Sequence, residues 1–268
     1  MPYSERDPAM PGGAVEEVVD HRWTAEPDKG LEPRRRVRGA KLGAAVVEHL
    51  VDDIVRGAAK PGAALPSEAE LCEEFGVSRT VIRESIKIVQ EKGLIRIEHG
   101  RGTQVTDPLQ WNLLDDVILT AVIRHDDSLE ILDELVSVRA ALEAEMAAGS
   151  ARNATDAHRG DLLAALDTMA TLVERAPDFA AADVHFHDVV MASSRNRLGR
   201  TIVTSIHDKA RTSMRYHGEY TAQMALQTVE EHRTVYQAII DGDPDRAASA
   251  MRTHIHDAWS RRRPTPTN

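Results

Sequence analysis

Four side chains in the second half of this 268-residue chain have the chemistry to hold a metal ion together. Asp183 and His187 are four residues apart, so they stack on one face of a helix. His232 and His254 each lie among apolar residues at helical spacing, which places both rings on inward faces. Taken singly, each histidine is better explained as a hydrogen-bonded core residue, but together the four could bind a divalent metal in a helical bundle.

A second group of residues, in the first half of the chain, has the chemistry to read DNA. Ser78 can cap a helix that carries Arg79 and Arg83 four residues apart on one face. Arginine is well suited to paired hydrogen bonds with guanine, and Ser78 and Thr80 can bond phosphates or bases. The pattern predicts a recognition helix whose first turn enters the major groove. The competing interpretation is a helical hairpin with incidental arginines.

The segments around this helix predict the elements that position it. A helix is expected over residues 40–56, and Ser67 with Glu70 forms a capping box at the start of a short helix over 67–75. The recognition helix follows over 78–92, and two strands over 94–98 and 103–106 form a hairpin. Helix, helix, tight turn, helix and hairpin, in that order, predict a winged helix-turn-helix.

The sequence pattern of the second half of the chain predicts helices throughout. Residues 109–262 contain about seven segments with apolar residues at helical spacing and none with strand-like alternation. One of these helices begins at Asp243 and Pro244, a favoured pair for a cap and a first helical position. We therefore expect a mainly α protein, in which an N-terminal winged helix-turn-helix precedes an all-α bundle of six to seven helices.

Charge and composition restrict the class of protein. The net charge is −10, yet residues 34–106 carry 13 basic and 10 acidic groups, which suggests a DNA-facing module between acidic stretches. No run of 18 apolar residues is present, and no apolar segment follows the first charges, so we expect neither a membrane span nor a secretory signal. The single cysteine, Cys72, excludes a disulfide framework and favours the cytoplasm.

The expected organisation has four parts. Residues 1–33, rich in proline and glycine, are expected to be a disordered tail. Residues 34–107 form the DNA-binding domain, 108–262 the helical domain and 263–268 a tail. The basic cluster over residues 34–38 is either an arm that lies on phosphates or a solvated charge run.

The residues of the first domain resemble the DNA-binding domain of the GntR family of bacterial transcription regulators. The resemblance is carried by Leu65-Pro66-Ser67-Glu68, by Gly76-Val77-Ser78-Arg79-Thr80-Val81-Ile82-Arg83-Glu84 and by Gly93-Leu94. It implies that the DNA contacts are Ser78, Arg79, Thr80, Arg83, His99, Gly100 and Arg101. One position departs from the family pattern, because Ala69 stands where the family usually has a DNA-contacting arginine.

The second half resembles the FCD effector domain of the FadR-like branch of that family. The resemblance implies a metal held by Asp183, His187, His232 and His254, whereas His185 and His256 are not expected to be ligands. Branch members that bind acyl-coenzyme A lack this full set, so a long-chain acyl ligand is not expected. An imidazole-rich site suits Zn, Ni, Mn or Fe.

The same resemblance implies a small effector beside the metal. An organic acid could fill the open coordination positions through its carboxylate and a neighbouring hydroxyl group. Arg139 is expected to face it, unless Arg139 pairs with Glu143 on the helix surface, and Asn196 and Tyr216 are further pocket candidates. The run Trp111-Asn112-Leu113-Leu114-Asp115 resembles the linker of family members that sense sugar acids such as galactonate.

These features predict a homodimeric DNA-binding regulator, a repressor that reads a short inverted repeat and is controlled by a hydroxy or sugar acid. The first alternative is the same regulator with a purely structural metal and no acid effector. The second is a metal-dependent hydrolase or isomerase. The enzyme alternative is disfavoured because no separate general base has a recognisable spacing and because the winged module would have no role.

Overall fold

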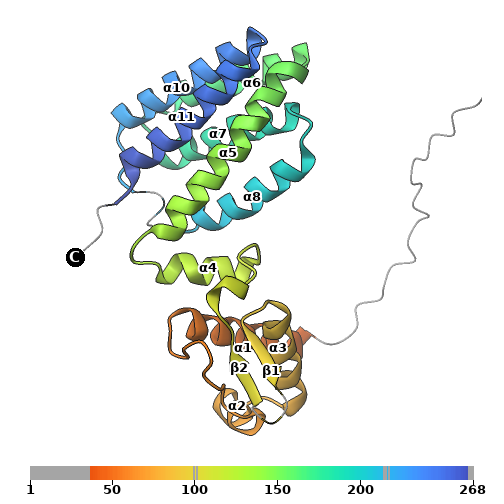
Figure 1. Cartoon of the computed structure of the whole chain (residues 1–268). Helices are drawn as coiled ribbons and strands as arrows, with labels where there is room; N and C mark the ends of the chain where they lie inside the picture. The colour runs from red at the N-terminus through yellow and green to blue at the C-terminus, as the bar shows by residue number, and fades with distance from the viewer. Residues whose placement is uncertain (1–36, 99, 101, 214–215, 217, 265–268) are drawn as a thin grey trace, which may run out of the picture. The chain divides into compact units, whose positions relative to one another are not determined.

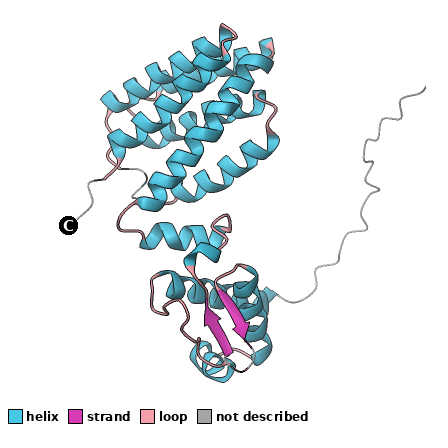
Figure 2. Cartoon of the chain, viewed as in Figure 1, coloured by secondary structure: helices cyan, strands magenta, loops and turns pink. Residues whose placement is uncertain are grey.

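The structure is a computed structural model that describes residues 37–98, 100, 102–213, 216 and 218–264 (Figure 1). The disordered tail expected over residues 1–33 lies outside the described residues, as do the side chains of the possible basic arm at 34–38. Helices dominate the described chain, and one two-stranded sheet is present in it (Figure 2). The expected fold class, a winged helix-turn-helix followed by a helical domain, is confirmed.

The first module contains three helices, and local signals in the sequence set their ends. They are α1 (Val37–Val55), α2 (Glu68–Phe75) and α3 (Arg79–Glu91). Ser67 and Glu70 form the expected capping box at the start of α2, and Gly76 ends that helix in the left-handed conformation. The Ser78 side chain accepts a hydrogen bond from the Val81 backbone N–H at the start of α3.

The wing is an antiparallel hairpin of β1 (Ile95–Glu98) and β2 (Gly102–Val105), in which Ile95 pairs with Val105. The core of this module is formed by the inner faces of α1 and α3 together with Leu71, Leu94 and Ile95. Ile95 and Ile97 share a face of β1, but only Ile95 is buried, whereas Ile97 lies closer to the turn and is 57% exposed.

A short linker leads from the wing to the helical domain. It contains one 3₁₀ turn, Pro108–Gln110, and the helix α4 (Asp116–His125), which Asp115 caps. Lys92, at the end of α3, forms an ion pair with Asp115. Residues of α4 contribute to two hydrophobic cores, since Ile118 packs with the winged module and Leu119 packs with the bundle.

Within the described residues, six longer helices form the bundle (Figure 1). They are α5 (Glu130–Asn153), α6 (Asp156–Thr171), α7 (Ala176–Ser193), α8 (Arg197–Arg211), α10 (Ala222–Ile240) and α11 (Pro244–Arg262). Asp243 caps α11 and Pro244 is its first residue, as expected. The helix α5 packs along α11 and also contacts α7, α8 and α10, so it lies at the centre of the bundle. None of the described helices is long and apolar enough to span a membrane.

Candidate functional site

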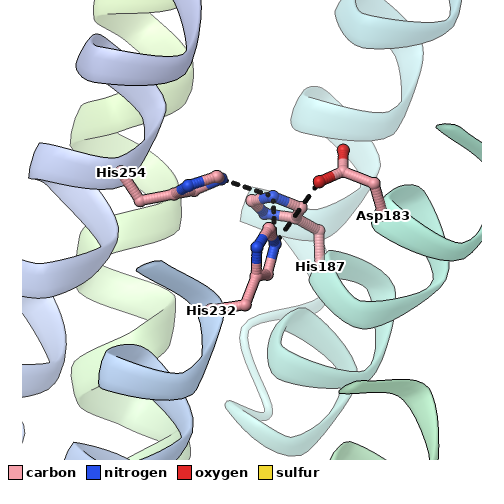
Figure 3. Close-up of side chains that lie close together, drawn as sticks. All are labelled: Asp183, His187, His232 and His254. Carbon is pink, nitrogen blue, oxygen red and sulfur yellow. Dashed lines mark hydrogen bonds and ion pairs between the residues drawn. The ribbon is translucent and has the colours of Figure 1, made fainter. Parts of the chain in front are cut away.

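Asp183, His187, His232 and His254 meet inside the bundle (Figure 3). Asp183 and His187 project from one face of α7, His232 from α10 and His254 from α11. One ligand atom from each residue lies within 4.8 Å of the other three. The structure therefore brings together all four residues that the sequence analysis selected, while His185 is exposed and points away from them.

The hydrogen bonds of the three imidazoles fix which ring nitrogen carries the proton. The Nδ1 atom of His232 lies 2.7 Å from the Thr228 carbonyl oxygen, which can only accept, so Nδ1 is the donor. Nδ1 of His187 donates to Glu143 at 2.5 Å, and Nδ1 of His254 donates to Glu231 at 2.8 Å. In neutral rings, the three Nε2 atoms therefore carry lone pairs that converge on one another.

The distances between these atoms fit a metal ion. Nε2 of His187 lies 3.2 Å from Nε2 of His254 and 3.3 Å from Nε2 of His232, and Oδ1 of Asp183 lies 3.4 Å from Nε2 of His232. Ligands about 2.1 Å from one ion are about 3.0–3.4 Å apart in octahedral or tetrahedral geometry. Converging lone pairs beside a carboxylate repel one another unless a cation lies between them. The donor set and its spacing are thus consistent with a divalent metal site.

Partner groups around the ligands complete this arrangement. A ligating histidine normally donates its second N–H to a carboxylate or a carbonyl, which orients the ring. Glu143, Glu231 and the Thr228 carbonyl oxygen play that part here. Sequence analysis did not identify them as supports. The Thr228 contact has a sequence signal, because residue i−4 of a helical histidine places its carbonyl within reach, whereas Glu143 and Glu231 lie on other helices than their histidines.

Arg139 forms an ion pair with Glu143, but in the interior of the protein and not on the helix surface. The Arg139 Nε–Glu143 Oε1 distance is 2.7 Å, and 4% and 1% of the two side chains are exposed. Nη1 of Arg139 also donates to the hydroxyl group of Tyr216 at 2.6 Å. The alternative that Arg139 pairs with Glu143 on the helix surface is therefore wrong in its location. The pair is buried, because Glu143 contacts both Arg139 and His187 inside the bundle.

The charges of the site are set by burial and by these neighbours. Burial lowers the pKa of His232 well below its usual range, and the nearby His254 lowers it further. Burial likewise lowers the pKa of His254 despite the opposing effect of Glu231. Burial alone would raise the pKa of Asp183, but the three imidazoles and Arg262 lower it well below the usual range. Burial therefore favours the neutral form of His232 and His254, and Asp183 is ionised, the forms that bind metals.

We expect the metal-free protein to lose stability as the pH falls below about 6.5, where unfolded histidines take up protons. His232, His254 and the buried His207 have lowered pKa values, so the folded state resists protonation while the unfolded state does not. Each such histidine removes up to about 1.4 kcal/mol per pH unit. Urea denaturation in a chelator between pH 8 and 5.5 measures this loss. The exposed His185→Gln variant is the control and should show the same loss as the wild type. A free energy of unfolding that does not change with pH would contradict the lowered pKa values of these histidines.

A cavity of about 420 Å³ opens beside this cluster. Asp183, His187 and His254 line it, as does Arg139, and its lining also includes apolar side chains such as Phe179 and Ala180. Such a volume is in the range of small-molecule sites. A smaller cavity, of about 200 Å³, lies against Arg139, His187 and residues of α8 that include His207. The larger cavity exposes metal ligands and cations together, so a small anion could reach both.

The three residues expected to bind an effector differ in their positions. Arg139 lines both cavities. Tyr216 is buried behind the cavity wall, where its hydroxyl group accepts hydrogen bonds from Arg139 and Arg262. Asn196 lines neither cavity, and its side chain caps α8 by accepting a hydrogen bond from the Gly199 backbone N–H. Arg261 and Arg262, which the sequence analysis did not select, also line the larger cavity.

Four of the expected DNA-contacting residues, Ser78, Arg79, Thr80 and Arg83, lie at the start of α3, and the other three belong to the wing turn. Arg79, Thr80 and Arg83 are exposed, and Arg83 forms an ion pair with Glu68 of α2 at 2.9 Å. Gly100 has a φ of 81°, a left-handed conformation that suits a tight wing turn. His99 and Arg101 lie outside the described residues. The exposed face of this helix therefore presents two arginines to solvent, and a groove of DNA can receive them.

Two family descriptions and several named proteins match this chain. Residues 42–105 match the bacterial regulatory proteins of the gntR family, and residues 134–257 match the FCD domain. The galactonate operon transcriptional repressor of Escherichia coli K12 is 33% identical over 81% of this chain and 94% of its own length. The transcriptional repressor NanR of Klebsiella aerogenes is 29% identical over 83% of this chain and 85% of its own length.

A solved structure shares the fold. It is that of Lar, described as controlling expression of the Listeria monocytogenes agr system, with a TM-score of 0.51 and 17% identity. The match covers 82% of this chain and 95% of that one. At this identity the likeness supports the fold alone.

Proposed function

This chain belongs to the gntR family of bacterial regulatory proteins and carries an FCD domain, and from that premise we propose that it is a metabolite-controlled repressor. It is a DNA-binding transcription regulator and not an enzyme. The repressor role in this proposal comes from the relatives' names, since two of them are described as repressors. We place its action at the chromosomal DNA in the cytoplasm, with residues 34–107 as the reading domain and 108–262 as the effector domain.

For the DNA contacts, we propose that Ser78, Arg79, Thr80 and Arg83 of α3 enter the major groove while the wing, His99 to Arg101, lies on the adjacent backbone. A homodimer would place two such helices on a short inverted repeat. The exposure of the two arginines on α3 supports this arrangement. Phosphate contacts by basic side chains would make the affinity fall with salt.

For the effector, we propose a small hydroxy or sugar acid that binds at a divalent metal held by Asp183, His187, His232 and His254. The observation that carries this proposal is the convergence of three Nε2 lone pairs and a carboxylate oxygen beside a cavity that Arg139 also lines. When bound, the metal would offer open positions to the acid's carboxylate and hydroxyl oxygens. Arg139 would bond the same carboxylate. Zn, Ni, Mn and Fe all suit the donor set.

The acid would act by favouring a dimer that cannot bind DNA. Releasing the operator about 100-fold needs a difference of about 2.7 kcal/mol in the acid's affinity for the two forms. The name of the Escherichia coli relative makes galactonate the first acid to test. Asn196 already caps α8, so the proposal relies on Arg139 for recognition, with Tyr216 holding the Arg139 guanidinium in place.

The metal and the acid can be tested separately by calorimetry. Protein dialysed against a chelator is titrated with Zn²⁺, Ni²⁺ and Mn²⁺, and we expect one ion per chain. Metal-loaded and metal-free protein are then titrated with the acids, and we expect binding only to the loaded form. Metal binding with no response to any acid would favour the purely structural metal. No metal binding would overturn the proposed site.

Restoring the family arginine at position 69 should tighten DNA binding. Ala69 is exposed on α2, next to Glu68, so Ala69→Arg would add a cation near the DNA backbone without disturbing a core. We expect the slope of log affinity against log salt to steepen by about two, because the dimer would gain one phosphate contact from each protomer. Fluorescence anisotropy on an operator duplex at several salt concentrations measures this slope. An unchanged slope would show that position 69 does not face the phosphates.

A further inference from the structure

Three arginines line the larger cavity, and two of them are already neutralised. Arg139 is paired with Glu143 in the interior. Arg261 forms two hydrogen bonds with Glu231, at 2.6 Å from Nη1 to Oε1 and 2.9 Å from Nη2 to Oε2. Each of these two ion pairs is close to neutral, so neither arginine offers an uncompensated positive charge to a ligand in the cavity.

Arg262 differs from the other two. Within the described residues, no carboxylate forms an ion pair with it, and its buried Nε has no hydrogen-bond partner. Its guanidinium lies over the Tyr216 ring, with Cζ 4.7 Å from the ring centroid, and Nη2 donates to the Tyr216 hydroxyl group at 3.3 Å. Tyr216 in turn stacks on Trp259. Arg262 is therefore held in place on the cavity wall with its charge unpaired.

The charge balance of the cavity favours a ligand with two negative charges. A divalent ion at the proposed site would use the charge of Asp183 and leave one positive charge there. Arg262 contributes a second positive charge on the same cavity wall. Glu219 also lines the cavity, but it is exposed to solvent, which screens its charge. A monocarboxylic acid would neutralise the ion's charge and leave Arg262 unpaired.

We propose that Arg262 is the anchor for a second anionic group of the effector, so that the effector is a hydroxy acid with a carboxylate at each end. This inference rests on the proposed function, because it assumes that one carboxylate binds at the metal. The free carboxylate would meet the guanidinium of Arg262, which lines the cavity. Charged hydrogen bonds in such a site are worth about 10- to 100-fold in affinity.

The test compares acids that differ in one terminal group. Galactonate and galactarate share a six-carbon skeleton, and the last carbon is a hydroxymethyl group in the first and a carboxylate in the second. The pair 2-hydroxybutyrate and malate has four carbons, and the last carbon is a methyl group in the first and a carboxylate in the second. Each acid is titrated by calorimetry into the full chain loaded with one equivalent of Zn²⁺. We expect the diacid of at least one pair to bind about 10- to 100-fold more tightly than its partner.

Variants then assign the preference to Arg262. Arg262→Gln should abolish the preference and leave the monoacid affinity and the Zn²⁺ affinity nearly unchanged, whereas Arg262→Lys should keep part of it. Arg252→Gln, an exposed position on the same helix, is the matched control and should keep all of it. The wild-type comparison needs no variant, so it tests the diacid preference even if Arg262→Gln does not fold, and Arg262→Lys then tests the assignment to Arg262.

Three outcomes would overturn the inference. The first is equal affinity for the two acids of both pairs, and the second is an equal loss of both affinities in Arg262→Gln. Either result would leave the proposed function intact, because an acid would still bind at the metal. The third is the absence of binding by every acid, which would overturn the proposed acid effector as well.

Discussion

Glu143→Gln is expected to lower the free energy of unfolding by about 3–5 kcal/mol and to weaken metal binding about 10- to 100-fold. The Glu143 carboxylate is 1% exposed and accepts hydrogen bonds from both Arg139 and His187. Burial alone would raise its pKa, but Arg139 and His187 lower it well below the usual range, so the carboxylate is ionised in the folded protein. A neutral amide would leave the buried Arg139 without a counter-charge.

The loss of metal affinity has a separate cause. Glu143 receives the Nδ1 proton of His187 and so keeps the Nε2 lone pair directed at the other ligands. An amide at this position can turn its NH₂ group toward the ring and allow the other tautomer, in which Nε2 carries the proton and cannot bind a metal. Stability and metal affinity should therefore fall together, although for different reasons.

Urea denaturation of the metal-free protein and calorimetric titration with Zn²⁺ measure the two effects. Glu145→Gln is the matched control, since Glu145 lies on the same helix but is 69% exposed and pairs with Arg152 at the surface. That control should change stability by less than about 1 kcal/mol. Equal effects of the two substitutions would show that Glu143 does not support the site. Replacing Arg139 and Glu143 together by leucine should recover part of the stability but not the acid response.

Arg79→Gln is expected to weaken operator binding by about 30-fold or more. Arg79 is exposed in the first turn of α3, where a side chain reaches the edges of the bases. An arginine that contacts guanine contributes about 1–3 kcal/mol of discrimination, and a dimer loses that contribution twice. Binding to unrelated DNA should fall much less, because it depends mainly on total charge.

Anisotropy titrations with operator DNA and with a scrambled duplex of the same length measure both affinities. Arg252→Gln removes one positive charge outside the winged module and serves as the control. An equal loss of affinity for the operator and the scrambled duplex would show that Arg79 contacts phosphates and not bases. Unchanged affinity for both duplexes would show that the start of α3 does not contact DNA.

The starts of the helices could be predicted from the sequence because their causes are local. Ser67 with Glu70, Ser78, and Asp243 with Pro244 each form hydrogen bonds within one turn, and each lies at the expected position. Strand alternation alone does not determine burial, since Ile97 shares a face with Ile95 but is 57% exposed.

The four metal-ligating candidates could also be predicted, because their residue types and helical faces are visible in the chain. Their supports could not, since Glu143 and Glu231 reach histidines on neighbouring helices and helix packing alone brings them there. Arg262 lies in a run of three arginines near the C-terminus that has the composition of a solvated surface. Only the position of its guanidinium, over Tyr216 and on the cavity wall, distinguishes it.

The central claim is that an acid at the metal site controls DNA binding, and one titration tests it most directly. Fluorescence anisotropy follows metal-loaded and metal-stripped protein binding to DNA from upstream of its own gene, with and without the mono- and diacids. The account predicts tight, salt-sensitive binding that one acid weakens about 100-fold in the metal-loaded protein only. Binding that no acid changes, or that an acid releases equally well without the metal, would contradict it.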